Sequence, residues 1–120
     1  MATFDVWDIV KVPFPYTDRP VRQRRPALVI GAGDLQASHG LLWLAMITSA
    51  ANRGWPGDVA VSDLGESGLP VASIVRPAKI ATIEARDAER LGILAISDRK
   101  AVASYLLDRF GMLFEQIRQS

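Results

Sequence analysis

Two adjacent arginines, Arg24 and Arg25, stand directly before a short apolar run that ends in a glycine, Pro26-Ala27-Leu28-Val29-Ile30-Gly31. Pro26 fixes its own φ and biases Arg25 toward an extended backbone, so we expect a strand that begins here with the arginines at its rim. A strand end holds a guanidinium on a rigid base, and arginine can bind a phosphate through two parallel hydrogen bonds. The pair therefore indicates a phosphate-handling site. Alternatively, the two charges only keep the end of a buried strand hydrated.

The arginine pair belongs to a local basic segment. Arg19 and Arg22 precede it, and no acidic residue interrupts the stretch between Asp18 and Asp34. The formal net charge of the whole chain is only +1, which is too small to indicate nucleic-acid binding by itself. The local cluster nevertheless makes Arg19, Arg22 and Arg24 candidates for contacts with backbone phosphates. Alternatively, the segment is only a solvent-exposed loop, which can carry the same residues.

Two hydroxyls, Thr48 and Ser49, follow the apolar run 41–47 in the way that Arg25 precedes the run 27–30. If these runs are neighbouring antiparallel strands, the end of one lies beside the start of the other. The guanidinium and the hydroxyls would then face the same phosphate. The competing interpretation is that both hydroxyls only hydrogen-bond a turn.

Two aromatic residues stand in segments rich in turn formers. Tyr16 lies next to the basic segment, and Trp55 lies between Gly54 and Pro56. Aromatic rings in such places can stack on the bases of single-stranded RNA. They can equally pack at the rim of the fold.

The composition excludes several kinds of chemistry. The chain has no cysteine, so it has no disulfide, no thiolate metal site and no cysteine nucleophile. With His39 as the only histidine, a zinc site would need carboxylates for most of its ligands. A G-x-S-x-G motif is missing, and Gly31-Ala32-Gly33 continues into neither of the common phosphate-binding loops. We therefore expect neither a metal nor a cofactor.

The length of 120 residues, with 49% hydrophobic and 22% charged residues, predicts one globular domain over residues 1–120. The N-terminal residues show no basic segment followed by an apolar core. The longest apolar run, 41–47, is too short to span a bilayer. We therefore expect a soluble, cytoplasmic protein.

The pattern of β-formers and breakers predicts strands first and one helix last. Polar segments 16–23, 32–40 and 52–58 are expected to be loops. Pro77 separates the last two apolar segments, which could therefore form a single bent strand. The expected strands are 6–14, 27–30, 41–47, 59–62, 72–76 and 79–83.

The C-terminal part of the chain has a different periodicity. From Ser97 onward, apolar residues recur at spacings of three and four, which predicts an amphipathic helix. Together with the strands, this predicts a mainly β protein, a small curved antiparallel sheet or barrel with the helix packed against it. The apolar positions of the helix are Val102, Tyr105, Leu106, Phe110, Leu113, Phe114 and Ile117.

Several motifs together resemble one family of toxins. The segment 8–18, which contains Pro-Phe-Pro-Tyr-Thr-Asp, and the segment 24–30 resemble the opening of the MazF/PemK toxin endoribonucleases. Met46-Ile47-Thr48-Ser49 is similar to the end of that family's third strand. The segments 68–70, 72–76, 79–83 and 91–94 are similar to its later blocks. The resemblance implies an SH3-like barrel of the MazF/PemK/CcdB type with a C-terminal helix.

The resemblance also implies a function. Such a protein is the toxin component of a type II toxin–antitoxin system, a homodimer that is controlled by a small antitoxin and cleaves single-stranded RNA without a metal ion. The catalytic residues would be Arg25 and Thr48, with Ser49, Tyr16 and Trp55 among the RNA-binding candidates. The reaction would be attack of the substrate's own 2′-hydroxyl on the adjacent phosphorus, giving a 2′,3′-cyclic phosphate.

Two positions depart from the family pattern. Trp7 stands where the family usually has a glycine before the aspartate, and the first loop lacks the Gly-Ser-Glu signature of another branch. Fold does not fix function, so two alternatives stay open. One is a module that binds DNA gyrase, DNA or a protein on the same barrel without catalysis. The other is an inactive relic of a toxin that still binds its partner.

Overall fold

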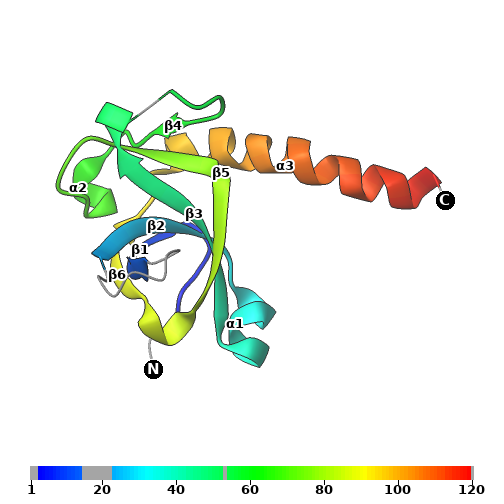
Figure 1. Cartoon of the computed structure of the whole chain (residues 1–120), viewed down its shortest axis with the longest axis horizontal. Coiled ribbons are helices and arrows are strands. Elements are labelled where there is room, and N and C mark those ends of the chain that lie inside the picture. Colours follow the sequence, from blue (N-terminus) through cyan, green and yellow to red (C-terminus); the bar gives the residue numbers. More distant parts are fainter. Residues whose placement is uncertain (1–2, 15–22, 53, 120) are drawn as a thin grey trace.

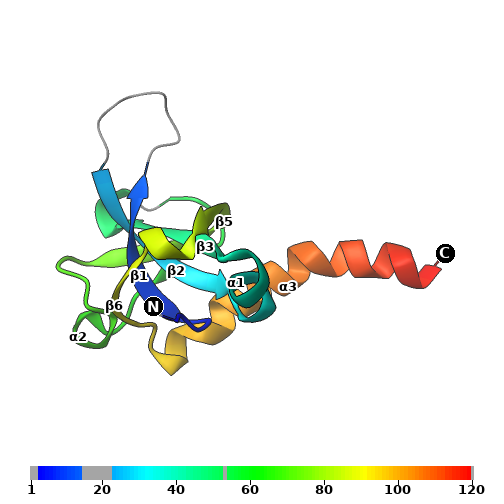
Figure 2. The same cartoon turned by 90° about the horizontal axis from the view of Figure 1, so that it is seen from below.

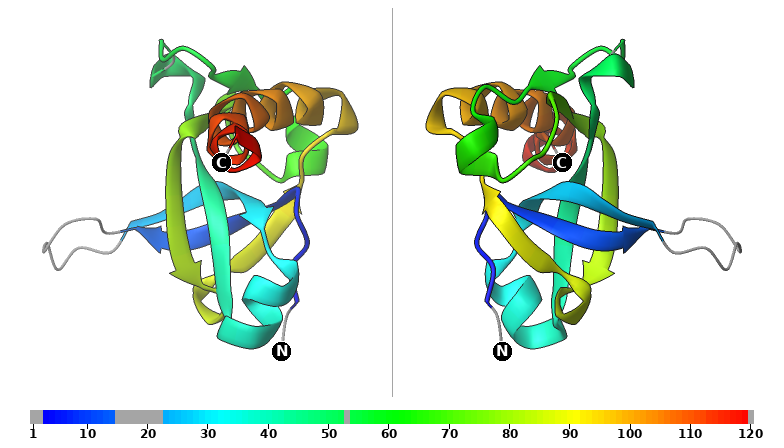
Figure 3. Two further views of the ribbon diagram at one scale, coloured as in Figure 1. Left: turned by 90° about the vertical axis from the view of Figure 1, so that its right-hand side faces the viewer. Right: turned by 90° about the vertical axis from the view of Figure 1, so that its left-hand side faces the viewer.

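The computed structural model describes residues 3–14, 23–52 and 54–119. Its strands form one antiparallel sheet in the order β4-β5-β3-β2-β1-β6, which curls into a half-barrel (Figures 1 and 3). This confirms the mainly β fold with a C-terminal helix. The strands are β1 (Asp8–Phe14), β2 (Gln23–Gly31), β3 (Leu41–Ser49), β4 (Val59–Ala60), β5 (Ser73–Glu84) and β6 (Glu89–Ile93).

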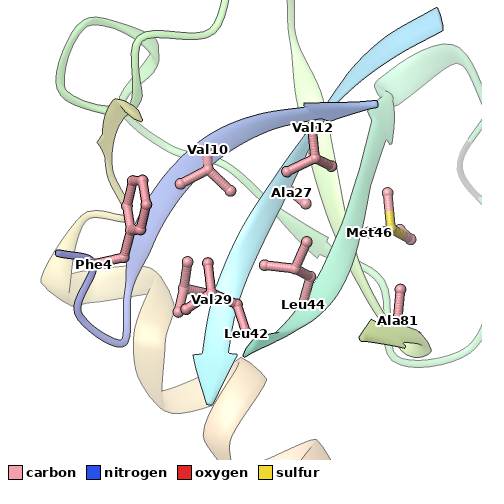
Figure 4. Close-up of a cluster of buried hydrophobic side chains, with 9 residues drawn as sticks. All are labelled: Phe4, Val10, Val12, Ala27, Val29, Leu42, Leu44, Met46 and Ala81. Carbon is pink, nitrogen blue, oxygen red and sulfur yellow. The ribbon is translucent and has the colours of Figure 1, made fainter. Parts of the chain in front are cut away.

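The interior of the half-barrel is filled by alternate side chains of the strands. Figure 4 shows the cluster that lies between β1, β2 and β3, with Phe4 closing one end. Burying one such aliphatic side chain contributes about 1.5–3 kcal/mol, so this cluster is a main source of stability. Its members are Phe4, Val10, Val12, Ala27, Val29, Leu42, Leu44, Met46 and Ala81.

The continuous apolar run of β3 is explained by a second cluster on the other face of the sheet. Ala45 and Ile47 pack there with Leu28 of β2 and with Val102 of the C-terminal helix. Residues 44–47 are therefore buried on both faces of the sheet, as the run predicted, whereas Trp43 is exposed.

The strand β5 is single and bent. Ala45 of β3 pairs with Ile80, but the next residue, Met46, pairs with Arg76. Residues 77–79 therefore bulge out of the ladder, and Pro77 has no N–H to lose by leaving it. This confirms the expectation of one strand that bends at Pro77. Arg76 stands directly before the bulge and pairs with Met46, three residues before the end of β3.

The C-terminal helix, α3, spans Ile96–Gln119. Its first turns pack on the sheet through Val102, which is fully buried, but its second half extends away from the barrel (Figures 1 and 2). The expectation that the whole apolar stripe packs on the barrel is therefore wrong. A helix of 24 residues is about 36 Å long, more than the sheet can cover. Leu113, Phe114 and Ile117 are 61–71% exposed. None of the helices in the described residues is long and apolar enough to cross a membrane.

Several expected loops contain regular structure. The segment 32–40 contains the helix α1 (Gly33–His39), which has no buried residue and ends at Gly40 with a φ of 66°. Without a buried face it has no apolar periodicity, so the sequence pattern could not show it. The connection around Gly65 contains α2 (Leu64–Ser67), and β6 was not expected at all. Two 3₁₀ helices, η1 (Ala50–Asn52) and η2 (Ala85–Asp87), complete the elements.

The first strand begins at Asp8, two residues later than expected, because Trp7 turns the chain. Trp7 has a φ of 81°, a conformation that costs a residue with a Cβ about 1–2 kcal/mol and glycine almost nothing. Its N–H donates to the carbonyl of Val29, and its carbonyl accepts from the N–H of Leu94, both at 2.9 Å. This geometry gives a physical reason for the glycine that the resemblance leads one to expect at this position.

Candidate functional site

The strands β2 and β3 are antiparallel neighbours, and their register relates Arg25 to Thr48. The last pair of the ladder toward this end is Ala27 with Met46. Beyond this pair the two strands separate, as Figure 3 shows. If the register were continued by two residues, Arg25 would come to the level of Thr48. Because side chains alternate along a strand, both lie on the face of Ala27 and Met46, at the rim of the barrel interior. By strand parity, Arg25 and Thr48 thus belong to the same face of the sheet, each just beyond the last pair of β2 with β3.

The side chain of Arg25 is exposed and is not engaged by an acidic group. Its Nη2 donates to Oε1 of Gln23 at 3.1 Å. Within residues 3–14, 23–52 and 54–119, no carboxylate lies within ion-pair distance of it. An exposed guanidinium without a carboxylate partner is suited to bind an anion such as a phosphate.

Arg24 lies on the opposite face of β2. Its Nη2 lies 3.4 Å from Oε2 of Glu89 on β6 and donates to the carbonyl of Lys11 at 3.3 Å. The structure therefore does not bring Arg24 and Arg25 together.

Three further candidates, Tyr16, Arg19 and Arg22, lie outside the described residues.

The hydroxyls of Thr48 and Ser49 have different partners. Oγ1 of Thr48 accepts a hydrogen bond from Nδ2 of Asn52 at 3.1 Å. Oγ of Ser49, which points to the other face of the strand, accepts from the N–H of Ala51 at 3.3 Å. Ser49 thus hydrogen-bonds the backbone of the turn, which was the competing interpretation for both hydroxyls. Thr48 instead bonds to the side-chain amide of Asn52.

A buried ion pair lies beside this strand end. Nε and Nη2 of Arg76 each contact one carboxylate oxygen of Asp58 at 3.0 Å, and the two side chains are only 11% and 9% exposed. Nη2 of Arg76 also donates to the backbone carbonyl of Asn52 at 2.8 Å. The hydrogen bonds from Arg76, and then those from the N–H groups of Trp55 and Gly54, lower the pKa of Asp58 below its ordinary value of 3.8.

The indole ring of Trp55 stacks on this ion pair. The guanidinium carbon of Arg76 lies 4.2 Å from the ring centroid, and the backbone N–H of Trp55 donates to Oδ2 of Asp58 at 3.1 Å. The side chain is nevertheless 48% exposed, so one face of the ring rests on the protein and the rest meets solvent. This is a rigid, flat surface near the end of β3, where Thr48 lies.

Sequence reasoning missed Asn52, Asp58 and Arg76 as members of the site. One signal was present, because an arginine inside the apolar segment Ser73-Ile74-Val75-Arg76 needs a buried partner. The partner itself could not be identified without the pairing of β3 with β5.

His39 lies far from this region. It is the last residue of α1 and precedes β3, whereas Thr48 lies at the other end of that strand. At about 3.3 Å per residue, the seven steps of β3 from Leu41 to Thr48 alone span roughly 23 Å along the strand. Within the described part of the chain, no three histidine, aspartate or glutamate side chains are gathered as a metal site.

Comparison with known proteins identifies the family. A family model of PemK-like, MazF-like toxins of type II toxin–antitoxin systems matches residues 5–110. The chain belongs to this family. The toxin sequence has no match among curated proteins.

Solved structures share the toxin's fold. MazF from Deinococcus radiodurans is 24% identical with a TM-score of 0.73, covering 92% of this chain and 99% of that chain. Toxin MazF-mt6 from Mycobacterium tuberculosis is 22% identical with a TM-score of 0.64, covering 85% and 95%. A mycobacterial endoribonuclease in complex with its cognate antitoxin is 15% identical with a TM-score of 0.69, covering 88% and 93%.

Proposed function

We propose that the toxin is an endoribonuclease that cleaves single-stranded RNA without a metal ion, with Arg25 and Thr48 as its catalytic residues. The observation that carries this proposal is the antiparallel pairing of β2 with β3, whose last pair, Ala27 with Met46, lies two residues from both Arg25 and Thr48. Membership of the PemK-like, MazF-like toxins supports it, as does the description of a structural neighbour as an endoribonuclease. The match over residues 5–110 also supports one toxin domain over the whole chain.

The proposed reaction uses the substrate's own nucleophile. The 2′-oxygen attacks the adjacent phosphorus and loses its proton, the bond from phosphorus to the 5′-oxygen breaks, and that oxygen takes up a proton. The products are a 2′,3′-cyclic phosphate and a 5′-hydroxyl. Negative charge that builds on the phosphoryl oxygens is stabilised by the guanidinium of Arg25 and by a hydrogen bond from the Thr48 hydroxyl. Arginine stays protonated near neutral pH, so Arg25 acts here as a cation and not as a base.

The exposed ring of Trp55 provides a second contact with the RNA, beside the catalytic pair. Stacking of a base on a fixed aromatic ring does not depend on the identity of the base. Trp55 therefore positions a nucleotide next to the one that is cut, while Ser49 and the basic residues Arg19, Arg22 and Arg24 contact the RNA backbone. Tyr16 is a second stacking candidate.

We further propose two protein partners, a small antitoxin and a second copy of the toxin. The antitoxin is supported by the family and by the solved MazE–MazF complexes of Deinococcus radiodurans. The second copy is supported by α3, whose apolar residues Phe110, Leu113 and Phe114 are exposed on one face of the helix. Two such faces packed together would remove this apolar surface from water.

The test is cleavage of a mixed-sequence RNA by the purified toxin in the presence of EDTA. We expect fragments that end in a 2′,3′-cyclic phosphate, and almost no cleavage by a folded Arg25→Ala variant. RNA binding without cleavage would support a binding module instead. Cleavage that stops in EDTA and returns with a divalent cation would contradict the metal-independent reaction.

A further inference from the structure

We propose that Asn52 is a positioning residue for the reaction, because it holds the Thr48 hydroxyl so that its hydrogen is donated to the phosphate. This inference rests on the proposed function. It assigns a role to a residue that neither touches the reacting phosphate nor forms part of the Arg25–Thr48 pair.

The hydrogen bond between Asn52 and Thr48 has a defined direction. A threonine hydroxyl has one hydrogen to donate and two lone pairs to accept with. Nδ2 of Asn52, which can only donate, lies 3.1 Å from Oγ1 of Thr48 and therefore occupies a lone pair. The hydroxyl hydrogen is left to point elsewhere. Because threonine is stiff about χ1, fixing the oxygen also limits where that hydrogen can point.

The backbone of Asn52 is anchored, although the residue is exposed. It ends η1, whose first residue, Ala50, donates its N–H to the carbonyl of Ala72 at 2.9 Å. The carbonyl of Asn52 accepts from Nη2 of Arg76 at 2.8 Å. Arg76 in turn is clamped by the buried carboxylate of Asp58. A line of hydrogen bonds thus runs from Asp58 through Arg76 and Asn52 to Thr48.

Positioning of the Thr48 hydroxyl and simple support of the turn predict different effects of Asn52 substitutions. A residue that only caps the turn affects the stability of the fold, and its loss acts equally whatever residue stands at position 48. A residue that acts through the Thr48 hydroxyl affects kcat, and its effect disappears when that hydroxyl is absent. A double-mutant cycle between Asn52 and Thr48 separates the two.

The experiment measures kcat and KM for RNA cleavage by Asn52→Ala, Asn52→Asp, Thr48→Ala and the two double variants. Asn52→Asp keeps the size of the side chain but replaces the donor by an acceptor. The carboxylate would attract the Thr48 hydrogen and turn it away from the substrate. We expect Asn52→Asp to lower kcat about 10²-fold, as far as Thr48→Ala does. Asn52→Ala only releases the hydroxyl, so it should lower kcat about 5- to 10-fold.

The matched control is Ala51→Asp, which places the same charge on the neighbouring exposed residue without a contact to Thr48. It should leave kcat almost unchanged. In the Thr48→Ala background, both Asn52 substitutions should change kcat by less than about twofold. Melting curves show that each variant is folded.

Two results would overturn the inference in different ways. If the wild-type toxin cuts RNA but Asn52→Asp keeps its kcat, or if the Asn52 variants lose as much without the Thr48 hydroxyl as with it, Asn52 does not position Thr48. In that case the proposed function stands. If the wild-type toxin does not cut RNA at all, the proposed function fails and the role of Asn52 fails with it.

Discussion

The guanidinium of Arg76 lies against one face of the Trp55 ring, 4.2 Å from its centroid. Because Arg76 is held at both carboxylate oxygens of Asp58, it fixes the plane of the ring as well as its position. An arginine can do this with its planar fork, whereas a lysine cannot. The ring is therefore ordered before any ligand arrives, which reduces the entropy lost when a base stacks on it.

The first prediction concerns this ring. Trp55→Ala should raise KM for RNA cleavage about tenfold or more and lower kcat much less, because base stacking contributes about 1–3 kcal/mol to binding. Trp55→Phe should retain part of the effect. Trp43 offers a matched control, since it is 49% exposed but lies near the other end of β3. If Trp43→Ala raises KM as much as Trp55→Ala, the stacking role is wrong.

The second prediction concerns acid stability. The pKa of Asp58 is lower in the folded protein than its ordinary value of 3.8, chiefly because of the hydrogen bonds from Arg76. The carboxylate therefore stabilises the fold above that value, and this contribution is lost as the pH falls through the lower, folded-state pKa. Asp58→Asn should unfold at lower urea concentration than wild type near pH 7.

The difference between the two proteins should begin to shrink near pH 4, where the unfolded chain becomes protonated at Asp58, and vanish once the pH has also fallen through the lower, folded-state pKa. Urea unfolding curves at several pH values measure it. A difference that stays constant down to about pH 2 would mean that the ionisation of Asp58 does not contribute to stability.

The third prediction concerns the catalytic pair. Arg25→Ala should lower the rate of RNA cleavage about 10²- to 10³-fold, and Thr48→Ala should lower it less, because a neutral donor contributes less than a charged one. Arg25→Lys keeps the charge but loses the planar fork, so it should recover little activity. Circular dichroism should show native folding, since both side chains lie at the rim of the sheet.

His39→Ala is the control for this series, because His39 lies at the opposite end of β3. It should retain most of the activity. A folded Arg25→Ala variant that cuts like wild type would show that Arg25 only marks the boundary of a strand.

The elements that could be predicted from the sequence are those with a pattern of their own. The run 41–47, the bend at Pro77 and the stripe of α3 each carry a local signal, and each element is present. The sequence analysis also assumed that the strands that carry Arg25 and Thr48 are antiparallel neighbours, and the pairing of β2 with β3 bears out that assumption.

The parts that could not be predicted depend on contacts between distant segments. Residues 33–39 form a helix without a buried face, and residues 89–93 become a strand only because β1 offers its edge. The pair of Arg76 with Asp58 joins residues 18 positions apart through the register of β5. No local periodicity contains that information, so the network behind Thr48 became visible only in the structure.

The fourth prediction concerns the exposed face of α3. Leu113→Glu should convert the proposed dimer to a monomer, because it would bury a charge without a partner. Gln116→Glu places the same charge on an exposed position of the same helix, away from the row of Phe110, Leu113 and Phe114, and should leave the dimer intact. Light scattering measures the mass of each variant. A wild-type monomer at micromolar concentration would contradict the dimer.

The length of α3 also has a consequence for how the toxin unfolds. A helix of fewer than about 12–15 residues is marginal in water unless its side chains pack on something, and the C-terminal half of α3 extends away from the sheet (Figure 2). In a single copy, its amide hydrogens should exchange with solvent far faster than those of β3. Association would slow that exchange, and the melting temperature would rise with protein concentration. Hydrogen exchange in the outer half of α3 thus measures association of the two copies, whereas exchange in the strands measures unfolding of the barrel.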